Sequence, residues 1–159
     1  TYNRGRADDC MKPKTVRKSV LVWHSPHEMF ELVSDVEHYP DFLPWCEYGR
    51  VVERTPDGMV ATIGMAFGGV HKHFTTRNVH EPDRHIHLQL VEGPFSQLEG
   101  DWRFTPVGDD SQRACRIDFA LVYGFSSSVL AALVGPVFDR VADSLVDAFV
   151  KRADQVYGA

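Results

Sequence analysis

The longest regular pattern in the chain is an apolar stripe at helical spacing near its C-terminal end, between Ser126 and Tyr157. Apolar residues three or four positions apart share one face of a helix. The stripe consists of Leu130, Val134, Val137, Phe138, Val141, Leu145, Ala148 and Phe149. The opposite face is charged, with Asp139, Arg140, Asp143, Asp147, Lys151 and Arg152. The pattern predicts a long amphipathic helix, broken once near Gly135 and Pro136 because proline lacks an N–H and clashes with the preceding turn.

Upstream of this helix, short β-rich segments alternate with turns that contain glycine, proline and aspartate. The predicted strands are Thr15–Trp23, Cys46–Thr55, Met59–Phe67, Val70–His80, His85–Glu92, Gln97–Val107 and Arg113–Phe125. Most connections are too short for a crossover, so neighbouring strands should pair antiparallel. Two short helices are expected after the first strand. Ser25 and Glu28 form a capping box for the first, and Pro40 ends the second, which covers Asp35–Tyr39.

These elements predict an α+β fold in which a curved antiparallel sheet of about seven strands wraps around the C-terminal helix. One helix does not fill a strongly curved sheet, so an apolar cavity is expected between the two, and such cavities are common ligand sites. The residues predicted to line it are Phe74, Thr76, Asn78, Leu88, Leu90, Leu98, Trp102, Phe104, Phe119, Leu121, Val134, Val137, Phe138 and Val141. Thr76 and Asn78 are either polar handles for a ligand head group or partners in a structural hydrogen bond.

Two segments are candidates for a gate to this cavity. Phe42 and Trp45 lie in a rigid aromatic loop, which serves either as a gate or as a plug that packs one end of the sheet. Gly135 and Pro136 form either a hinge that lets the helix lift or a kink that follows the curve of the sheet.

Composition narrows the classes of function. A chain of 159 residues suits one domain. The net charge of −5 gives no support to nucleic-acid binding, and no DNA partner is expected. Lys12, Lys14, Arg17 and Lys18 nevertheless form a local basic cluster, which would contact RNA phosphates, anionic lipid or only water. Three cysteines without a CxxC motif indicate a reducing, cytoplasmic setting. Residues 1–10 are polar and without pattern. We expect these residues to be a disordered or artificial upstream tail. The folded domain is expected to span residues 11–159. The protein is expected to make at most peripheral contact with a membrane.

Catalytic and metal-binding patterns are weak. His71 and His73 share one strand face, as do His85 and His87, and a short turn joins their strands. All four are expected on the outer, solvated face without a carboxylate beside them, so no metal site is predicted. No GxSxG motif occurs, and Cys115 is expected to be a small buried apolar residue. We therefore predict a binding protein and not an enzyme.

Three blocks of sequence carry a resemblance to a known family. They are residues 35–46 (DVEHYPDFLPWC), residues 91–104 (VEGPFSQLEGDWRF) and residues 135–153 (GPVFDRVADSLVDAFVKRA). Together they resemble the family of coenzyme Q-binding proteins and the ribosome-association toxin RatA, within the START-like (polyketide cyclase-like) superfamily. The third block is closer to the bacterial RatA branch than to the mitochondrial branch.

The resemblance implies a single START-like domain with the helix-grip fold, a cavity for a lipophilic molecule and no required cofactor. Mitochondrial members bind ubiquinone and support respiration, so ubiquinone or another isoprenoid or lipid is the first expected ligand. The bacterial toxin binds the large ribosomal subunit and blocks 70S assembly, which is the alternative function. A polyketide cyclase or dehydratase is the second alternative. The family has no agreed catalytic residues, so none is carried over.

Overall fold

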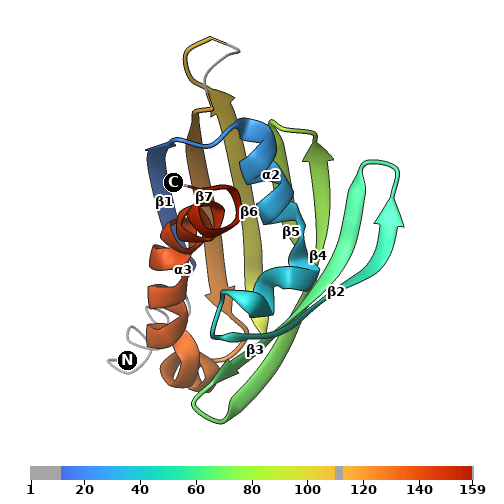
Figure 1. Cartoon of the computed structure of the whole chain (residues 1–159). Helices are drawn as coiled ribbons and strands as arrows, with labels where there is room; N and C mark the ends of the chain where they lie inside the picture. The colour runs from blue at the N-terminus through green and yellow to red at the C-terminus, as the bar shows by residue number, and fades with distance from the viewer. Residues whose placement is uncertain (1–11, 110–112, 159) are drawn as a thin grey trace.

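The chain forms one curved antiparallel sheet and three helical segments, described by a computed structural model for residues 12–109 and 113–158. The expected upstream tail, residues 1–10, lies outside this described part. The seven strands follow the order β1-β7-β6-β5-β4-β3-β2, and the long C-terminal helix α3 crosses the concave face of the sheet (Figure 1). The helix-grip arrangement predicted from the sequence is therefore confirmed.

The strands agree with the predicted segments to within one or two residues at most ends. They are β1 (Lys14–Val22), β2 (Cys46–Thr55), β3 (Gly58–Phe67), β4 (Val70–Glu81), β5 (His85–Glu92), β6 (Phe95–Pro106) and β7 (Cys115–Phe125). From β2 to β7, each strand pairs antiparallel with the next in sequence, as short turns require. The first strand pairs with the last, with Val16 opposite Leu121.

Local capping explains where the helices begin. Helix α2 (Pro26–Ser34) starts after Ser25, whose hydroxyl accepts the Glu28 N–H at 3.1 Å while Glu28 Oε1 accepts the Ser25 N–H at 2.8 Å. The short 3₁₀ helix η1 (Val36–Asp41) follows. Helix α3 (Ser128–Tyr157) starts after Ser127, whose hydroxyl accepts the Leu130 N–H at 3.1 Å. The capping box predicted from the sequence is confirmed.

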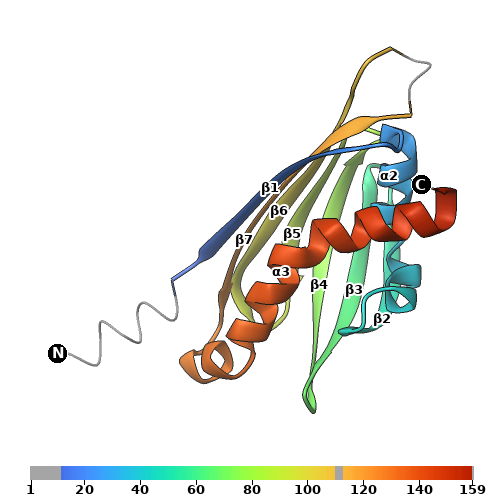
Figure 2. The same cartoon turned by 60° about the vertical axis from the view of Figure 1, so that its left-hand side comes forward.

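The predicted break in α3 is wrong. The helix runs for 30 residues without interruption, with Pro136 inside it. Val134 and Phe138 lie on either side of the proline, and both are buried against the sheet. Packing therefore holds the helix together where proline removes a backbone hydrogen bond, and the helix curves along its length (Figure 2).

Aromatic side chains join α3 to the sheet. The ring of Phe138 lies 4.7 Å from that of Tyr123 and 5.3 Å from that of Phe95. Phe149 meets Trp102 edge-on at 5.3 Å. Offset and edge-on pairs of this kind add to the free energy gained from burying the rings. Of the apolar stripe predicted from the sequence, Val134, Phe138 and Phe149 are buried and the other members are partly buried. The buried face of α3 also includes residues outside that prediction, namely Ala131, Gly135, Ala142, Val146 and Ala153.

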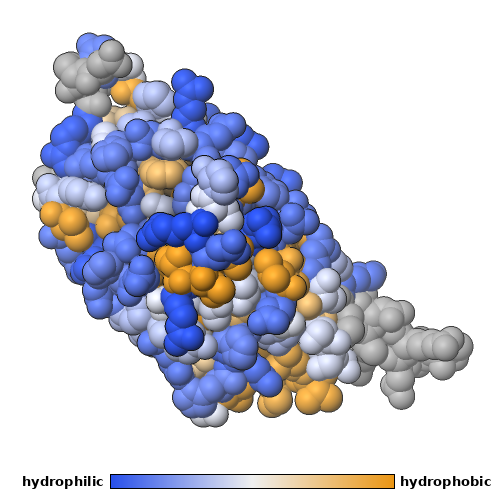
Figure 3. Space-filling model, turned by 90° about the vertical axis from the view of Figure 1, so that its right-hand side faces the viewer, coloured by the Kyte–Doolittle hydropathy of each residue, from blue (hydrophilic) through white to orange (hydrophobic). Residues whose placement is uncertain are grey.

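On the side of the molecule that carries β2, hydrophobic side chains form small patches separated by hydrophilic ones (Figure 3). Scattered apolar residues of this kind are normal for a protein surface. Within the described residues, no helix has both the length and the apolar character needed to cross a bilayer.

Candidate functional site: an interior cavity and the outer face of the sheet

A small apolar cavity lies between the concave face of the sheet and α3. Its volume is about 100 Å³. The side chains around it are Val36, Tyr39, Trp45, Ala61, Ile63, Phe74, Thr76, Asn78, Leu88, Leu98, Trp102, Phe119, Leu121, Phe138, Val141, Ala142, Leu145 and Phe149. They come from η1, the loop after it, strands β3 to β7 and the middle of α3.

Most of the residues predicted to line a cavity do surround this one. They are Phe74, Thr76, Asn78, Leu88, Leu98, Trp102, Phe119, Leu121, Phe138 and Val141. Alternation along each strand identified the inward face, and the helical stripe identified the facing side of α3.

Four of the predicted lining residues lie elsewhere in the core. Phe104 is buried beneath α2, with its ring 6.2 Å from that of Phe30. Leu90 and Val137 are partly buried against the core, and Val134 is fully buried. Each has the inward orientation that the pattern predicted. The strands and α3 are longer than the cavity, so inward residues near their ends pack against other elements.

The two gate candidates of the aromatic loop, Phe42 and Trp45, lie in different surroundings. Trp45 borders the cavity and stacks on Phe67, with ring centroids 6.5 Å apart. Phe42 instead packs on Phe149 at 5.1 Å, and the Arg152 guanidinium lies 5.3 Å from the Phe42 ring centroid. Phe42 therefore packs against α3 outside the cavity lining, in line with the plug interpretation.

Gly135 and Pro136 do not border the cavity either. They line a different hollow of about 210 Å³, together with Lys12, Lys14 and Tyr123. A hinge at this position would act on the outer side of the helix–sheet seam and not on the interior cavity.

Several residues around the cavity were not predicted from the sequence. They are Val36, Tyr39, Ala61, Ile63, Ala142, Leu145 and Phe149. Ala61 and Ile63 alternate with residues of the outer face, and Leu145 and Phe149 belong to the apolar stripe, so the signal was present in the pattern. Val36 and Tyr39 carry no comparable signal, because a 3₁₀ helix of six residues has no clear amphipathic period.

Polar side chains in the cavity are few, and those of Thr76, Asn78 and Tyr39 are engaged in hydrogen bonds. Thr76 Oγ1 donates a hydrogen bond of 2.7 Å to Asn78 Oδ1, and both residues are buried. The Tyr39 hydroxyl donates to the Val33 carbonyl, and burial raises the pKa of Tyr39. Tyr39 is the one ionisable side chain among the described residues around the cavity. The lining therefore suits an apolar group and offers no acid–base pair.

The two described cysteines are not nucleophiles at neutral pH. Burial raises the pKa of Cys46 to about 11 and that of Cys115 to about 12. A buried thiol with such a pKa stays protonated and behaves as a small apolar side chain.

The outer face of the sheet carries a hollow of about 550 Å³ across β1, β7 and β6. Arg17, Lys18 and Arg103 line it, together with Asp101 and Asp118. Both carboxylates are already paired, Asp118 with Arg116 at 3.2 Å and Asp101 with two histidines. In the described part of the chain, neither Arg17 nor Arg103 has an ion pair, so their guanidinium groups give the hollow a positive excess. Lys18 lies opposite the inward-facing Phe119, so its side chain is on the concave side of the sheet.

The four strand histidines all lie on the outer face, as predicted, but they form two separate groups. The prediction that no carboxylate lies beside them is wrong, because His71 contacts Glu47 and both His85 and His87 contact Asp101. The pairing of β4 with β5 ends at Thr75 and Glu92, so His71 and His73 lie beyond the end of β5. His85 and His87 instead face Asp101 on β6.

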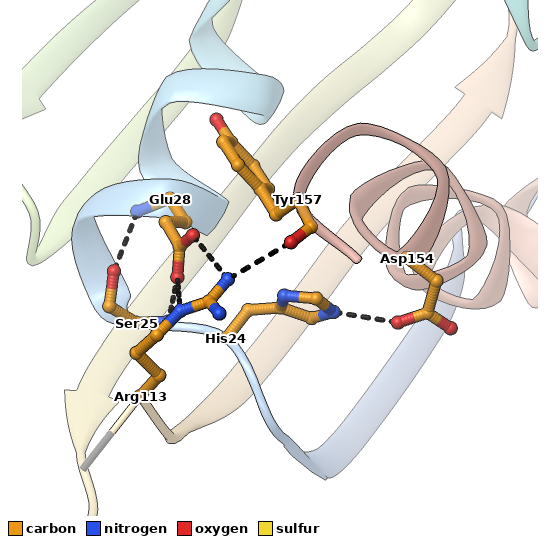
Figure 4. Close-up of polar contacts among 6 residues, drawn as sticks. All are labelled: His24, Ser25, Glu28, Arg113, Asp154 and Tyr157. Atoms are coloured by element: carbon orange, nitrogen blue, oxygen red, sulfur yellow. Dashed lines mark hydrogen bonds and ion pairs between the residues drawn. The ribbon is translucent and has the colours of Figure 1, made fainter. Parts of the chain in front are cut away.

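Apart from these histidines, a cluster of polar side chains joins the N-terminal end of α2 to the C-terminal end of α3 (Figure 4). Arg113 donates to both carboxylate oxygens of Glu28, at 3.0 and 2.7 Å, and to the Tyr157 carbonyl at 3.5 Å. This pairing lowers the pKa of Glu28 to about 2. Buried His24 contacts Asp154 Oδ1 through Nε2 at 2.6 Å. The group ties the C-terminal end of α3 to α2 and the β6–β7 connection.

The fold and the cavity define a class of protein in which a curved sheet grips one long helix around an apolar interior. Residues 22–150 match the family of polyketide cyclases / dehydrases and lipid transport proteins, and the chain belongs to this family. Within this family, the chain resembles the branch that contains the coenzyme Q-binding proteins and RatA.

Two relatives and one solved structure illustrate the match. The chain is 42% identical to the ribosome association toxin RatA of Escherichia coli (strain K12), over 91% of the chain and 89% of the relative. It is 28% identical to the mitochondrial coenzyme Q-binding protein COQ10 homolog B of Xenopus laevis, over 89% of the chain and 58% of the relative. The solution structure of the 18 kDa protein CC1736 from Caulobacter crescentus is 34% identical, with a TM-score of 0.68 over 94% of the chain and all of that protein.

Proposed function

We propose that this chain is a ribosome-associating protein of the RatA type, which acts by binding through its outer surface and not by catalysis. The observation that carries the proposal is the 42% identity to RatA across 91% of the chain and 89% of that relative. Following the branch that the sequence resembles, the expected partner is the large ribosomal subunit in the cytoplasm, and the expected effect is loss of 70S particles.

The interior supports an outer-surface role because it is too small for a bulky cargo. The cavity of about 100 Å³ is smaller than the roughly 150 Å³ that holds one benzene molecule in an engineered core. Ligand pockets commonly have about 300–1,000 Å³. A quinone with an isoprenoid tail exceeds the available space several-fold.

The hollow on the outer face supplies a suitable surface for RNA. The outward-facing Arg17 and Arg103 line it without ion-pair partners among the described residues. RNA binding draws much of its affinity from such cations, because phosphate contacts release condensed counterions. We assign the rRNA backbone to this hollow, although the whole chain is acidic.

Sedimentation tests both the function and the surface. The chain, expressed in the bacterium that supplies the ribosomes, should co-sediment with large subunits and lower the 70S peak. An Arg17→Gln/Arg103→Gln double variant should weaken co-sedimentation and its salt dependence, whereas Arg77→Gln, exposed on the outer face of β4, should not. Unchanged ribosome profiles and no co-sedimentation of the unaltered chain would refute the function. Equal binding by both variants would refute the assigned surface.

Binding of a lipophilic ligand is the second candidate, with ubiquinone as the named possibility. The observation in its favour is a cavity with an almost wholly apolar lining, in which the Thr76–Asn78 pair is the main polar feature. Entry of a large ligand would require Trp45 or Phe138 to move. Such a ligand would be compatible with ribosome association, because the two use different surfaces.

Organic extraction and mass spectrometry of purified protein test this second candidate. A bound lipid should be absent from an Ala61→Leu variant, in which a larger side chain at a buried lining position fills the cavity. The same variant should keep co-sedimenting with ribosomes. Repeated absence of lipid from the unaltered protein, made in quinone-containing cells, would count against the carrier role.

The cyclase or dehydratase alternative is the weakest of the three. Such chemistry needs a general acid and base at the reacting atoms. The hydroxyl of Tyr39 is already engaged with the Val33 carbonyl, and the other described lining side chains do not titrate.

A further inference from the structure

Two histidines on the outer face of β5 converge on one carboxylate oxygen of β6. His85 Nε2 lies 2.6 Å from Asp101 Oδ1, and His87 Nδ1 lies 2.9 Å from the same oxygen. His87 is directly opposite Asp101 in the antiparallel pairing, and His85 is two residues away on the same face. The three side chains are partly buried, on neighbouring strands in the middle of the sheet.

The donor atoms already have the spacing of a metal site. One ligand atom from each residue lies within 4.8 Å of the others. Zinc bonds to imidazole nitrogen and carboxylate oxygen are about 2.0–2.2 Å long, which puts tetrahedral ligand atoms about 3.3 Å apart. A small withdrawal of the Asp101 carboxylate would therefore open the centre of the cluster to an ion.

A second carboxylate orients one of the rings. His87 Nε2 lies 3.2 Å from Glu99 Oε1, on the side of the imidazole away from Asp101. When Glu99 accepts the Nε2–H, the Nδ1 lone pair is free to bind a metal. Metal-binding histidines commonly have such a partner, which sets the tautomer and raises the basicity of the ligating nitrogen.

This cluster differs from the other histidine–carboxylate contacts in the described part of the chain. His27 pairs singly with Asp83, and His38 pairs singly with Asp35. Among the described residues, Asp101 alone has one oxygen that two imidazoles share. The sequence placed the two histidines on one face correctly, but Asp101 joins them through strand register, which the spacing of histidines did not reveal.

We propose that His85, His87 and Asp101 form a binding site for a divalent transition metal ion, with Zn²⁺ as the best-fitting ion. Two imidazole nitrogens and one carboxylate oxygen suit zinc, and the position on an open sheet leaves the fourth coordination place to water. The proposal does not depend on ribosome association or on an interior ligand.

Metal titration of the purified full chain is the direct test. Zn²⁺ should bind with one-to-one stoichiometry in competition with a chromophoric chelator. Co²⁺, used as a spectroscopic probe, should give the visible absorption of a four-coordinate site. His87→Ala and Asp101→Asn should each lose most of this affinity, and Glu99→Gln should weaken it by about 10–100-fold.

His73→Ala is the matched control, because His73 is an exposed outer-face histidine of β4 outside the cluster. Circular dichroism at matched temperature should confirm that each variant is folded. Absence of Zn²⁺ binding by the unaltered chain would overturn the proposal and leave a hydrogen-bonded cluster only. Equal affinity losses in the His73→Ala and His87→Ala variants would overturn it as well.

Discussion

The hydroxyl of Tyr123 on β7 donates a hydrogen bond to the carboxylate of Asp139 on α3, across the seam between sheet and helix. Lys14 Nζ reaches the other oxygen of the same carboxylate at 2.6 Å. Tyr123 is only 1% exposed, so its polar group depends on this partner. Asp139 therefore lies at the border of the buried stripe and not on the solvated face of α3.

Replacement of Asp139 by alanine should lower the free energy of unfolding by about 1–3 kcal/mol, because the buried Tyr123 hydroxyl loses its acceptor. Asp147→Ala, at an exposed position on the same helix, should change it by less than about 0.5 kcal/mol. Urea unfolding at pH 7 measures both. Equal stability of the two variants would mean that the seam contact contributes nothing.

The Glu28–Arg113 pair should make the fold sensitive to acid. The pKa of Glu28 is lowered to about 2 from its ordinary value of 4.5, so the folded state favours the ionised carboxylate. The resulting stabilisation is complete above pH 4.5 and is lost as the pH falls toward 2. Because Arg113 is 55% exposed, we expect solvent screening to make the effect much smaller than that of a buried ion pair.

A Glu28→Gln variant should be less stable than the unaltered chain at pH 7, and the difference should shrink as the pH approaches 2. Glu31→Gln, an exposed change on the same helix, is the control. Urea unfolding at pH 7, 4 and 2.5 measures the trend. A constant difference between Glu28→Gln and the unaltered chain at all three pH values would contradict the assignment.

Phe149 should be among the most costly residues of α3 to truncate. Its ring contacts Tyr39 at 5.3 Å, Phe42 at 5.1 Å and Trp102 at 5.3 Å, and it is 1% exposed. Phe149→Ala should lower the free energy of unfolding by about 3–5 kcal/mol through lost burial and an enlarged cavity. Val156→Ala on the same helix, at a half-exposed side chain, should lower it by less than about 1 kcal/mol.

The Thr76–Asn78 hydrogen bond can be tested by a double-mutant cycle. Thr76→Val removes the donor and leaves Asn78 Oδ1 buried without its partner, at an expected cost of about 1–3 kcal/mol. In an Asn78→Leu background the same change should cost clearly less, because no acceptor remains. Strict additivity of the two changes in chemical denaturation would indicate that the bond contributes no coupling.

Much of the fold follows from short-range pattern. Alternation put Thr76 and Asn78 on the inner face, helical spacing put Phe138 and Phe149 on the buried side of α3, and the capping box at Ser25 marked a helix start. These patterns predict the structure correctly because each depends only on residues close together in the chain. The backbone geometry fixes the period of a strand and of a helix.

Tertiary structure decided the rest. The volume of the cavity is the small difference between the volume that the sheet and α3 enclose and the volume of the side chains inside it. Both volumes depend on residues that are far apart in the sequence. The meeting of His85 and His87 with Asp101 depends on register between strands, and the continuity of α3 through Pro136 depends on Val134 and Phe138 packing on distant residues. The sequence by itself determined the helix-grip arrangement and the inward faces, whereas contacts between remote segments determined how little room remains inside and which groups meet on the surface.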